Sequence, residues 1–572
     1  MSPYNIFGLQ EPTGIILDYM DTNDRARLAG CNNQLFYMLM PSLWERVEGL
    51  ARLFALSPYL DLMSGKNHTL YTTSEIEQFV ASQRPLDDKD LVRFDVYSPW
   101  IKHLEVCKHG SAPEYDGALA LLYIYSQSRA ILPNITFISL TVQLYSRANP
   151  ISVIPFLSSS LLGLEFSLTD SLYHSNISMA ESAILLSLVS ARCPQLKTLG
   201  FTPQDVNYPQ SYRSETSLLR TLTQIIDQSL EEKLGHYLGY FITPFQPLVR
   251  FTSSVNILDV SSFGLVSTWP CLESFEILFD GELLELPSFS DTAFPVLTHL
   301  GLHQVPDWTT LEDVWDNPAI VSKLTSIKLD VAESCSDFES DPVDEIILAF
   351  SILGTRSPHT QNLWLHVENP DDYSYVMSTS DLDQLGSLPL HSLHLGGISF
   401  KRPEDIPRYI ATTFPGIKEL GLPNHLIKLN ELQVFRSELP LLEVLRIKFK
   451  LKTISPDFEV DLSDVPRHRN IPLHTLEANF IGSREEETRL DIFSMEYSNA
   501  KALSSYLFTL WPNIQITAQG ACQYIPEFYR YLKLMALIND HLARLSYCNR
   551  DSLIQYQSIH ALNEDSWEDC KR

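Results

Sequence analysis

Histidine and cysteine residues at short spacing are the usual ligands of zinc, and one such group stands at His103, Cys107 and His109. These residues fall on a predicted strand and loop, and no second pair completes a zinc site. The chain also lacks the motifs of serine hydrolases, phosphate-binding loops, dinucleotide-binding folds and zinc proteases. The sequence therefore predicts no catalytic residue, no metal and no cofactor, and it argues against an enzyme.

An apolar phrase with the spacing L-x-x-L-x-L recurs along the chain. Copies that begin two residues after a proline start at Leu196, Leu272, Leu297, Ile417 and Leu442. Weaker copies start at Ile101, Ile135, Leu161, Leu324, Leu390 and Leu473. The starts at Leu272, Leu297 and Leu324 are 25 and 27 residues apart, which lies within the period of leucine-rich repeats. The chain is therefore expected to be a repeat array.

Helix-like runs such as Ser182–Val189 and Ile346–Leu353 lie between the phrases. A strand that alternates with a helix on this cycle predicts parallel strands stacked side by side. The predicted fold class is an α/β leucine-rich-repeat solenoid, with the parallel strands on the concave face and the helices on the convex face. An ordinary doubly wound sheet is the alternative, but such sheets do not keep one apolar phrase in register so many times.

Residues between and after the leucines of a phrase point away from the core, because side chains alternate along a strand. In the central and later repeats, these positions hold His299, His303, Lys328, Trp364, His394, Arg446 and Lys448. In a chain with a net charge of −28, they predict a substrate-binding surface that prefers an acidic or phosphorylated protein. The alternative is that strand faces in any array carry some charge, and that histidine tolerates a half-exposed strand.

Composition excludes several classes of function. The chain has 42 basic and 70 acidic residues, so it would repel phosphate backbones, and no nucleic-acid partner is expected. No apolar run is long enough to span a membrane, and Met1–Met20 has neither the basic residue nor the apolar run of a secretory signal. We therefore expect no membrane partner, reduced cysteines and a cytoplasmic and/or nuclear location.

The N-terminal apolar residues have helical spacing, and Pro41 is expected to end the second helix before Leu43 and Trp44. The stretch Leu9–Trp44 resembles an F-box, with Asp21-x-x-Asp24 after the first helix and Arg27-Leu28-Ala29 in the second. It departs from the F-box pattern at Leu9-Gln10, where Leu-Pro is usual, at Gly14 inside the first helix, and at Asn33, where a basic residue is common. A helical hairpin that caps the first repeat fits the same residues and is the alternative.

The F-box resemblance implies a Skp-type adaptor and, through it, a cullin–RING ubiquitin ligase as partners. The residues that it places against the adaptor are Leu9, Ile16, Met20, Leu28, Cys31, Leu35, Leu43 and Trp44.

Four domains are expected along the chain: a small all-helical F-box-like module (1–47), a helical connector (48–100), an irregular leucine-rich-repeat array (101–520), and a capping helix with a polar tail (521–572). This order, and phrases such as CPQLKTLGF and FPVLTHLGL, resemble the F-box-like proteins with leucine-rich repeats of filamentous fungi. The resemblance implies a non-catalytic substrate receptor of a Skp–cullin–F-box ubiquitin ligase, which binds an unknown protein substrate through the array. The alternative is a leucine-rich-repeat interaction scaffold without ligase attachment.

Other segments interrupt or end the array. Ser214–Phe241 reads as an amphipathic helix, and a degenerate repeat is expected around Val255–Val260. Asp330–Glu345 is rich in carboxylates and is expected to be a solvated loop. The amphipathic run Tyr524–Leu545 is suited to covering the last repeat.

Overall fold

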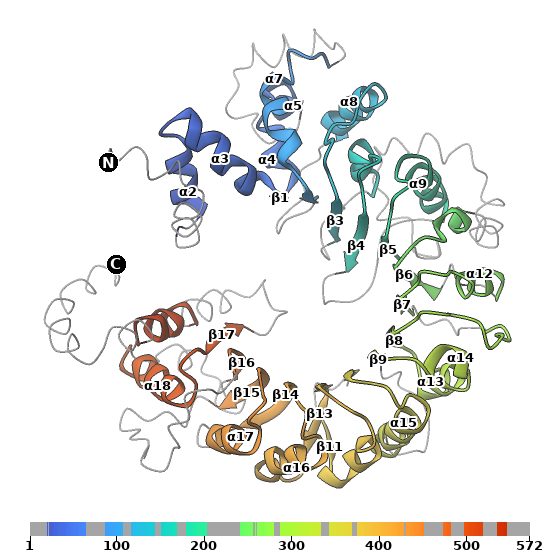
Figure 1. Cartoon of the computed structure of the whole chain (residues 1–572), viewed down its shortest axis with the longest axis vertical. Coiled ribbons are helices and arrows are strands. Elements are labelled where there is room, and N and C mark those ends of the chain that lie inside the picture. Colours follow the sequence, from blue (N-terminus) through green and yellow to red (C-terminus); the bar gives the residue numbers. More distant parts are fainter. Residues whose placement is uncertain are drawn as a thin grey trace, which may run out of the picture. The chain divides into compact units, whose positions relative to one another are not determined.

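The protein is described by a computed structural model, shown in Figure 1. The described residues are 20, 22–63, 86–106, 116–142, 150–168, 179–202, 241–255, 258, 260–279, 286–332, 342–368, 374–427, 431–450, 473–481, 497–518 and 535–545. The chain divides into two compact units, Met1–Leu297 and Thr298–Arg572, and each is described by itself.

The first unit holds parallel strands that pair in chain order. They are β1 (Arg46–Glu48), β2 (His103–Glu105), β3 (Phe137–Val142), β4 (Gly163–Leu168), β5 (Thr198–Phe201), β6 (Arg250–Ser254) and β7 (Ser274–Leu278). Its helices include α2 (Thr22–Ala29), α3 (Asn33–Trp44), α4 (Leu50–Phe54), α5 (Pro58–Met63), α7 (Val92–Tyr97), α8 (Asp116–Ser126), α9 (Met179–Arg192) and α12 (Val260–Val266). Short 3-10 helices cover Ser98–Trp100 (η2), Pro150–Phe156 (η3) and Thr243–Phe245 (η5).

The second unit repeats this arrangement. Its strands are β8 (His299–Val305), β9 (Ser326–Ala332), β10 (Asn362–Glu368), β12 (Ser392–Gly396), β14 (Glu419–Ile427), β15 (Val444–Lys450), β16 (Thr475–Ile481) and β17 (Gln515–Ala518), again parallel and in chain order. A separate parallel pair joins β11 (Tyr375–Met377) to β13 (Ile398–Phe400). The helices include α13 (Trp308–Trp315), α14 (Pro318–Val321), α15 (Pro342–Arg356), α16 (Ile406–Thr413), α17 (Leu432–Glu438) and α18 (Tyr497–Leu510), with 3-10 helices at Thr379–Leu385 (η7) and Pro403–Asp405 (η8).

The apolar phrase produces this fold by alternation. In β9, Ile327 and Leu329 are buried while Lys328 between them is only half-buried. Equivalent leucines lie in register from strand to strand, so that Ile327 pairs with Leu363 and Leu363 with Leu393. Within each unit, the helices lie on one side of the strands (Figure 1). We call the opposite side, which carries Lys328, the open face.

Each unit is thus a stack of strand–helix repeats, and the fold is an α/β leucine-rich-repeat solenoid, as the sequence predicts. The predicted runs Ser182–Val189 and Ile346–Leu353 lie within α9 and α15. Among the described residues, no helix combines the length and the apolar character needed to cross a membrane.

Four expectations about the elements are wrong in detail. The carboxylate-rich stretch Asp330–Glu345 is not a loop throughout, because residues 330–332 belong to β9 and residues 342–345 to α15, while residues 333–341 lie outside the described residues. The sheet begins at Arg46 rather than at residue 101, because Val47 lies in register with Leu104. The degenerate repeat expected around Val255–Val260 has its strand at Arg250–Ser254, where buried serines replace part of the apolar pattern. Pro41 does not end the second helix: α3 continues to Trp44, since burial of residues on both sides of the proline outweighs the lost hydrogen bond.

Candidate functional site

Strand register in the second unit brings four of the predicted substrate-binding residues into one row on the open face. Lys328 pairs with Trp364, and Trp364 pairs with His394. Gly421 lies opposite His394 and, on its other side, opposite Arg446. Adjacent strands are about 4.8 Å apart, so Lys328, Trp364 and His394 are immediate neighbours, while Arg446 lies one strand further along the row.

Three of these side chains stack on one another. The Lys328 ammonium lies 5.4 Å from the centroid of the Trp364 ring, within the range of a cation–π interaction. The ring of His394 stacks on Trp364, with centroids 5.2 Å apart and planes 11° from parallel. We call Lys328, Trp364 and His394 the Trp364 platform.

A glycine on the next strand makes room for the platform. A Cβ atom at Gly421 would overlap the Nδ1 atom of His394, so the imidazole occupies the space that a side chain there would need. The same holds for His366, whose ring occupies the space over Gly396. The rings of His366 and His394 therefore both lean over a glycine of the neighbouring strand.

The charges of the row differ from the sequence expectation. His394 is only 8% exposed, and burial, Arg446 and His366 lower its pKa to about 3, so it is neutral at physiological pH. The guanidinium of Arg446 donates from Nε to Glu477 at 2.7 Å and lies 3.6 Å from Glu419. Lys328, in contrast, makes no ion pair with any residue that the structure describes. The row therefore offers one uncompensated cation rather than the basic surface expected for an acidic or phosphorylated partner.

The other predicted substrate-binding residues lie around this row. His299 on β8 shares a hydrogen bond of 2.9 Å with Ser326, in the neighbouring row. His303 lies at an irregular part of β8, where the register with β9 shifts between Leu302 and Val305. Lys448 lies two residues beyond Arg446 on β15, opposite Asn479. These three residues do not join the Trp364 platform.

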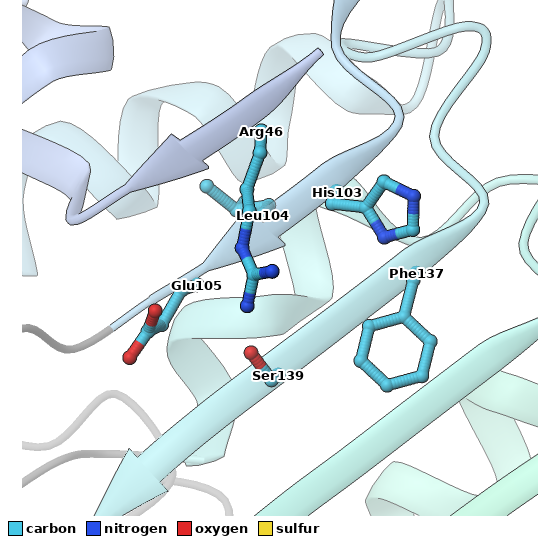
Figure 2. Close-up of a pocket in the computed structure, with 6 residues that line it drawn as sticks. All are labelled: Arg46, His103, Leu104, Glu105, Phe137 and Ser139. Carbon is cyan, nitrogen blue, oxygen red and sulfur yellow. The ribbon is translucent and has the colours of Figure 1, made fainter. Parts of the chain in front are cut away.

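A shallow pocket lies on the open face of the first unit (Figure 2). It has a volume of about 200 Å³, below the usual size of small-molecule sites. Its lining residues come from β1, β2 and β3 and are Arg46, His103, Leu104, Glu105, Phe137 and Ser139. His103 contacts Phe137 with ring centroids 6.0 Å apart, whereas Cys107 and His109 lie outside the described residues. Within the part of the chain that the structure describes, no three metal-ligating side chains come together.

The N-terminal helices are held to the first repeat by aromatic rings. Asn32 caps α3 by accepting a hydrogen bond of 2.8 Å from the backbone N–H of Leu35. Trp44 packs on Tyr97 of α7 with ring centroids 4.6 Å apart, and Phe36 contacts Trp100 at 5.9 Å. The hairpin α2–α3 is therefore continuous with the array, as the capping alternative predicts.

The expected adaptor-binding residues are distributed unequally. Leu35, Leu43 and Trp44 are buried within this chain, so they anchor the hairpin and are not open to a partner. Met20 and Leu28 are half-buried, and Cys31 is exposed. Leu9 and Ile16 lie outside the described residues. The most exposed apolar residue of α3 is Tyr37, at 65%, which the sequence reasoning did not include.

Sequence reasoning also missed the two groups that support the sites. Gly421 makes room for His394. The sequence could have indicated this, because Gly421 and His394 occupy the same position in two consecutive phrases and therefore lie opposite each other. Tyr97 and Trp100 contact the aromatic residues of α3 and hold this helix in place. The sequence could have indicated this, because the two aromatic residues stand directly before the phrase that begins at Ile101.

Comparisons with known proteins give structural neighbours alone. No family model matches the chain, and no curated protein does. Similar solved structures include the leucine-rich repeat-containing protein LegL7 from Legionella pneumophila, at 16% identity over 70% of this chain and 98% of that chain, with a TM-score of 0.29. An internalin (inlF) from Listeria monocytogenes has 12% identity over 70% and 94% of the two chains, with a TM-score of 0.26. A TLR13–ssRNA13 complex has 16% identity over 68% and 47%, with a TM-score of 0.27. These TM-scores are low, so the fold is assigned from the strand register of this chain and not from its similarity to these structures.

Proposed function

We propose that the protein is a non-catalytic receptor that binds a protein partner through the open face of its second unit. The observation that carries this proposal is the Trp364 platform, a preformed and partly exposed aromatic stack on a rigid sheet. Tryptophan is enriched among the residues that dominate protein–protein binding energy. The proposal includes no catalytic step, because the sequence contains none of the catalytic motifs considered above.

Site-specific photocrosslinking tests this proposal. A photoreactive phenylalanine analogue replaces Trp364 in one variant and Leu348 in the other. Leu348 is a matched control, because it is an apolar residue on α15, 48% exposed, on the helical side of the same unit. We expect a covalent adduct with a cellular protein at position 364 and none at position 348. Adducts at position 348 alone would place the binding surface on the helices and contradict the proposal.

A second candidate function is substrate receptor of a Skp–cullin–F-box ubiquitin ligase, acting in the cytoplasm or nucleus. It is supported by the F-box resemblance and by the position of α2 and α3 directly before β1, with Tyr37 exposed on α3. In this function the array holds the substrate while the helices hold the adaptor. The receptor supplies proximity, because it raises the effective concentration of substrate lysines near the conjugating enzyme.

The ligase function is tested with point substitutions rather than deletion of residues 1–47, because that deletion would remove most of β1 and uncover Tyr97. We expect Tyr37→Asp to abolish co-purification of a Skp-type adaptor and a cullin. Val92→Asp is the control, since Val92 is equally exposed, at 65%, but lies on α7. If the unaltered protein captures no adaptor, the receptor acts as a scaffold without ligase attachment.

A further inference from the structure

We propose that the Trp364 platform recognises a short protein segment in which an aliphatic or aromatic side chain stands next to a single carboxylate, and not a phosphorylated segment. This inference rests on the proposed function and names the chemistry of the partner. It departs from the sequence expectation of an acidic or phosphorylated partner.

The apolar part of the inference follows from how Trp364 is held. Lys328 lies against its ring from β9, and His394 stacks on it from β12, so the indole is fixed in one orientation before any partner binds. His394 is itself fixed, because its ring lies over Gly421. A partner side chain that packs on this surface loses its own conformational freedom but does not need to order the platform, which favours binding.

The carboxylate in the proposed partner follows from which charged groups around the platform already have an ion-pair partner within this chain. Arg446 is held between Glu419 and Glu477, and His394 is nine-tenths buried beside Arg446. Asp330 follows Lys328 on the open face, in register with His366. One ammonium, that of Lys328, is thus left to meet an incoming anion, and several carboxylates lie nearby.

One cation suits one carboxylate. A phosphate group carries a charge of about −1.5 to −2 and is usually held by several donors, often from arginine. Arg446 does not supply them here, because its guanidinium already serves Glu419 and Glu477. The carboxylates of this face would also repel a dianion more than a monoanion.

The experiment selects ligands from a random peptide display library on the immobilised full-length protein and measures the Kd of the enriched peptides after synthesis. We expect enriched peptides with an aliphatic or aromatic residue next to Asp or Glu. Trp364→Ala should raise Kd more than about tenfold and Lys328→Gln about two- to fivefold. Lys323→Gln is the control, an exposed lysine of the same repeat outside the platform, and should leave Kd unchanged. Replacing the peptide carboxylate by phosphoserine should not strengthen binding.

The outcomes separate this inference from the proposed function. Peptides that bind Trp364→Ala and wild type equally, or that bind more tightly when phosphorylated, overturn the inference while the receptor function stands. If no peptide is enriched and photocrosslinking at Trp364 yields no adduct, both fail. Thermal unfolding of each variant identifies any loss of folding, and Lys328→Gln, a substitution at a half-exposed side chain, tests the inference where Trp364→Ala does not fold.

Discussion

Asn539 forms two hydrogen bonds with the backbone of Ile516, the second residue of β17. The Oδ1 atom accepts from the Ile516 N–H at 2.9 Å, and Nδ2 donates to the Ile516 carbonyl at 2.7 Å. β17 pairs with β16 on its other side, and residues 535–545 are helical. The side-chain amide therefore stands where the backbone of a further strand would be. This is the covering role expected for Tyr524–Leu545, of which residues 524–534 lie outside the described residues.

We expect Asn539→Leu to lower the free energy of unfolding by about 1–3 kcal/mol, because both Ile516 groups lose their partner. Asn539→Asp retains the acceptor but loses the donor to the carbonyl, so it should also be destabilising. Asp540→Asn is the control, since Asp540 is an exposed neighbour on the same helix. Denaturant unfolding followed by circular dichroism measures the change, and equal midpoints for all three variants would mean that the last strand is stabilised in another way.

Strand register predicts opposite responses at neighbouring positions of β15. Leu445 is fully buried, so Leu445→Ala should lower the free energy of unfolding by about 2–5 kcal/mol. Arg446 lies on the open face with its side chain 27% exposed, and its ion pairs with Glu419 and Glu477 are those of a partly solvated group. Arg446→Ala should therefore lower it by less than about 1 kcal/mol. Similar losses at both positions, measured by denaturant unfolding, would contradict the register.

The strands with a complete apolar phrase were predictable, because each phrase states both the period of a strand and its buried face. Strands with an altered phrase were not all among the predicted copies. β10 begins its phrase at Thr360, whose buried hydroxyl donates to the Ser357 carbonyl, so this copy was not recognised although Trp364 was assigned to the open face. In β17, Ile514 stands two residues after Pro512 as in the other copies, but the next buried apolar residue, Ile516, follows after two residues instead of three. β1 has one buried residue, Val47, and its pairing with β2 spans a separation that local pattern does not reveal.

The platform was predictable as a set of neighbours but not in its charge. Alternation placed Lys328, Trp364, His394 and Arg446 on one face, and this is where they lie. The neutral state of His394 depends on burial by adjacent strands, and the compensation of Arg446 depends on glutamates from β14 and β16. Both are properties of contacts between repeats, which the sequence of one repeat does not contain.

Gly421 is predicted to be necessary for the position of His394. Gly421→Ala would place a methyl group in the space that the His394 imidazole occupies. The imidazole would have to move, and this displacement should lower the free energy of unfolding by about 1–3 kcal/mol. Gly416→Ala is the control, because the nearest side-chain atom, Cδ2 of His391, would lie 3.5 Å from the new Cβ atom. Near-ultraviolet circular dichroism should report the altered packing of Trp364 in the first variant alone. An unchanged spectrum and stability for Gly421→Ala would show that His394 does not depend on the glycine.

His394 should make the protein less stable as the pH falls below its ordinary pKa. Burial, Arg446 and His366 lower its pKa from 6.5 to about 3, so between these values the unfolded chain binds a proton that the folded chain does not. As the pH falls from 6.5 to 3, His394 should therefore lower the free energy of unfolding by about 1.4 kcal/mol per pH unit. Above pH 6.5, His394 should have no effect on the pH dependence of stability. His394→Phe keeps an aromatic ring beside Trp364 and removes the titration.

Unfolding free energies of wild type and His394→Phe, measured from pH 8 to pH 4, test this prediction, because the titrations of groups that do not interact with His394 cancel in their difference. We expect the difference to be constant above about pH 6.5 and to move in favour of the variant as the pH falls. His391→Gln, at an exposed histidine directly before β12, is the control substitution in the same repeat. A difference between wild type and His394→Phe that stays constant down to pH 4 would mean that His394 accepts a proton in the folded chain, and the platform would then carry a second cation.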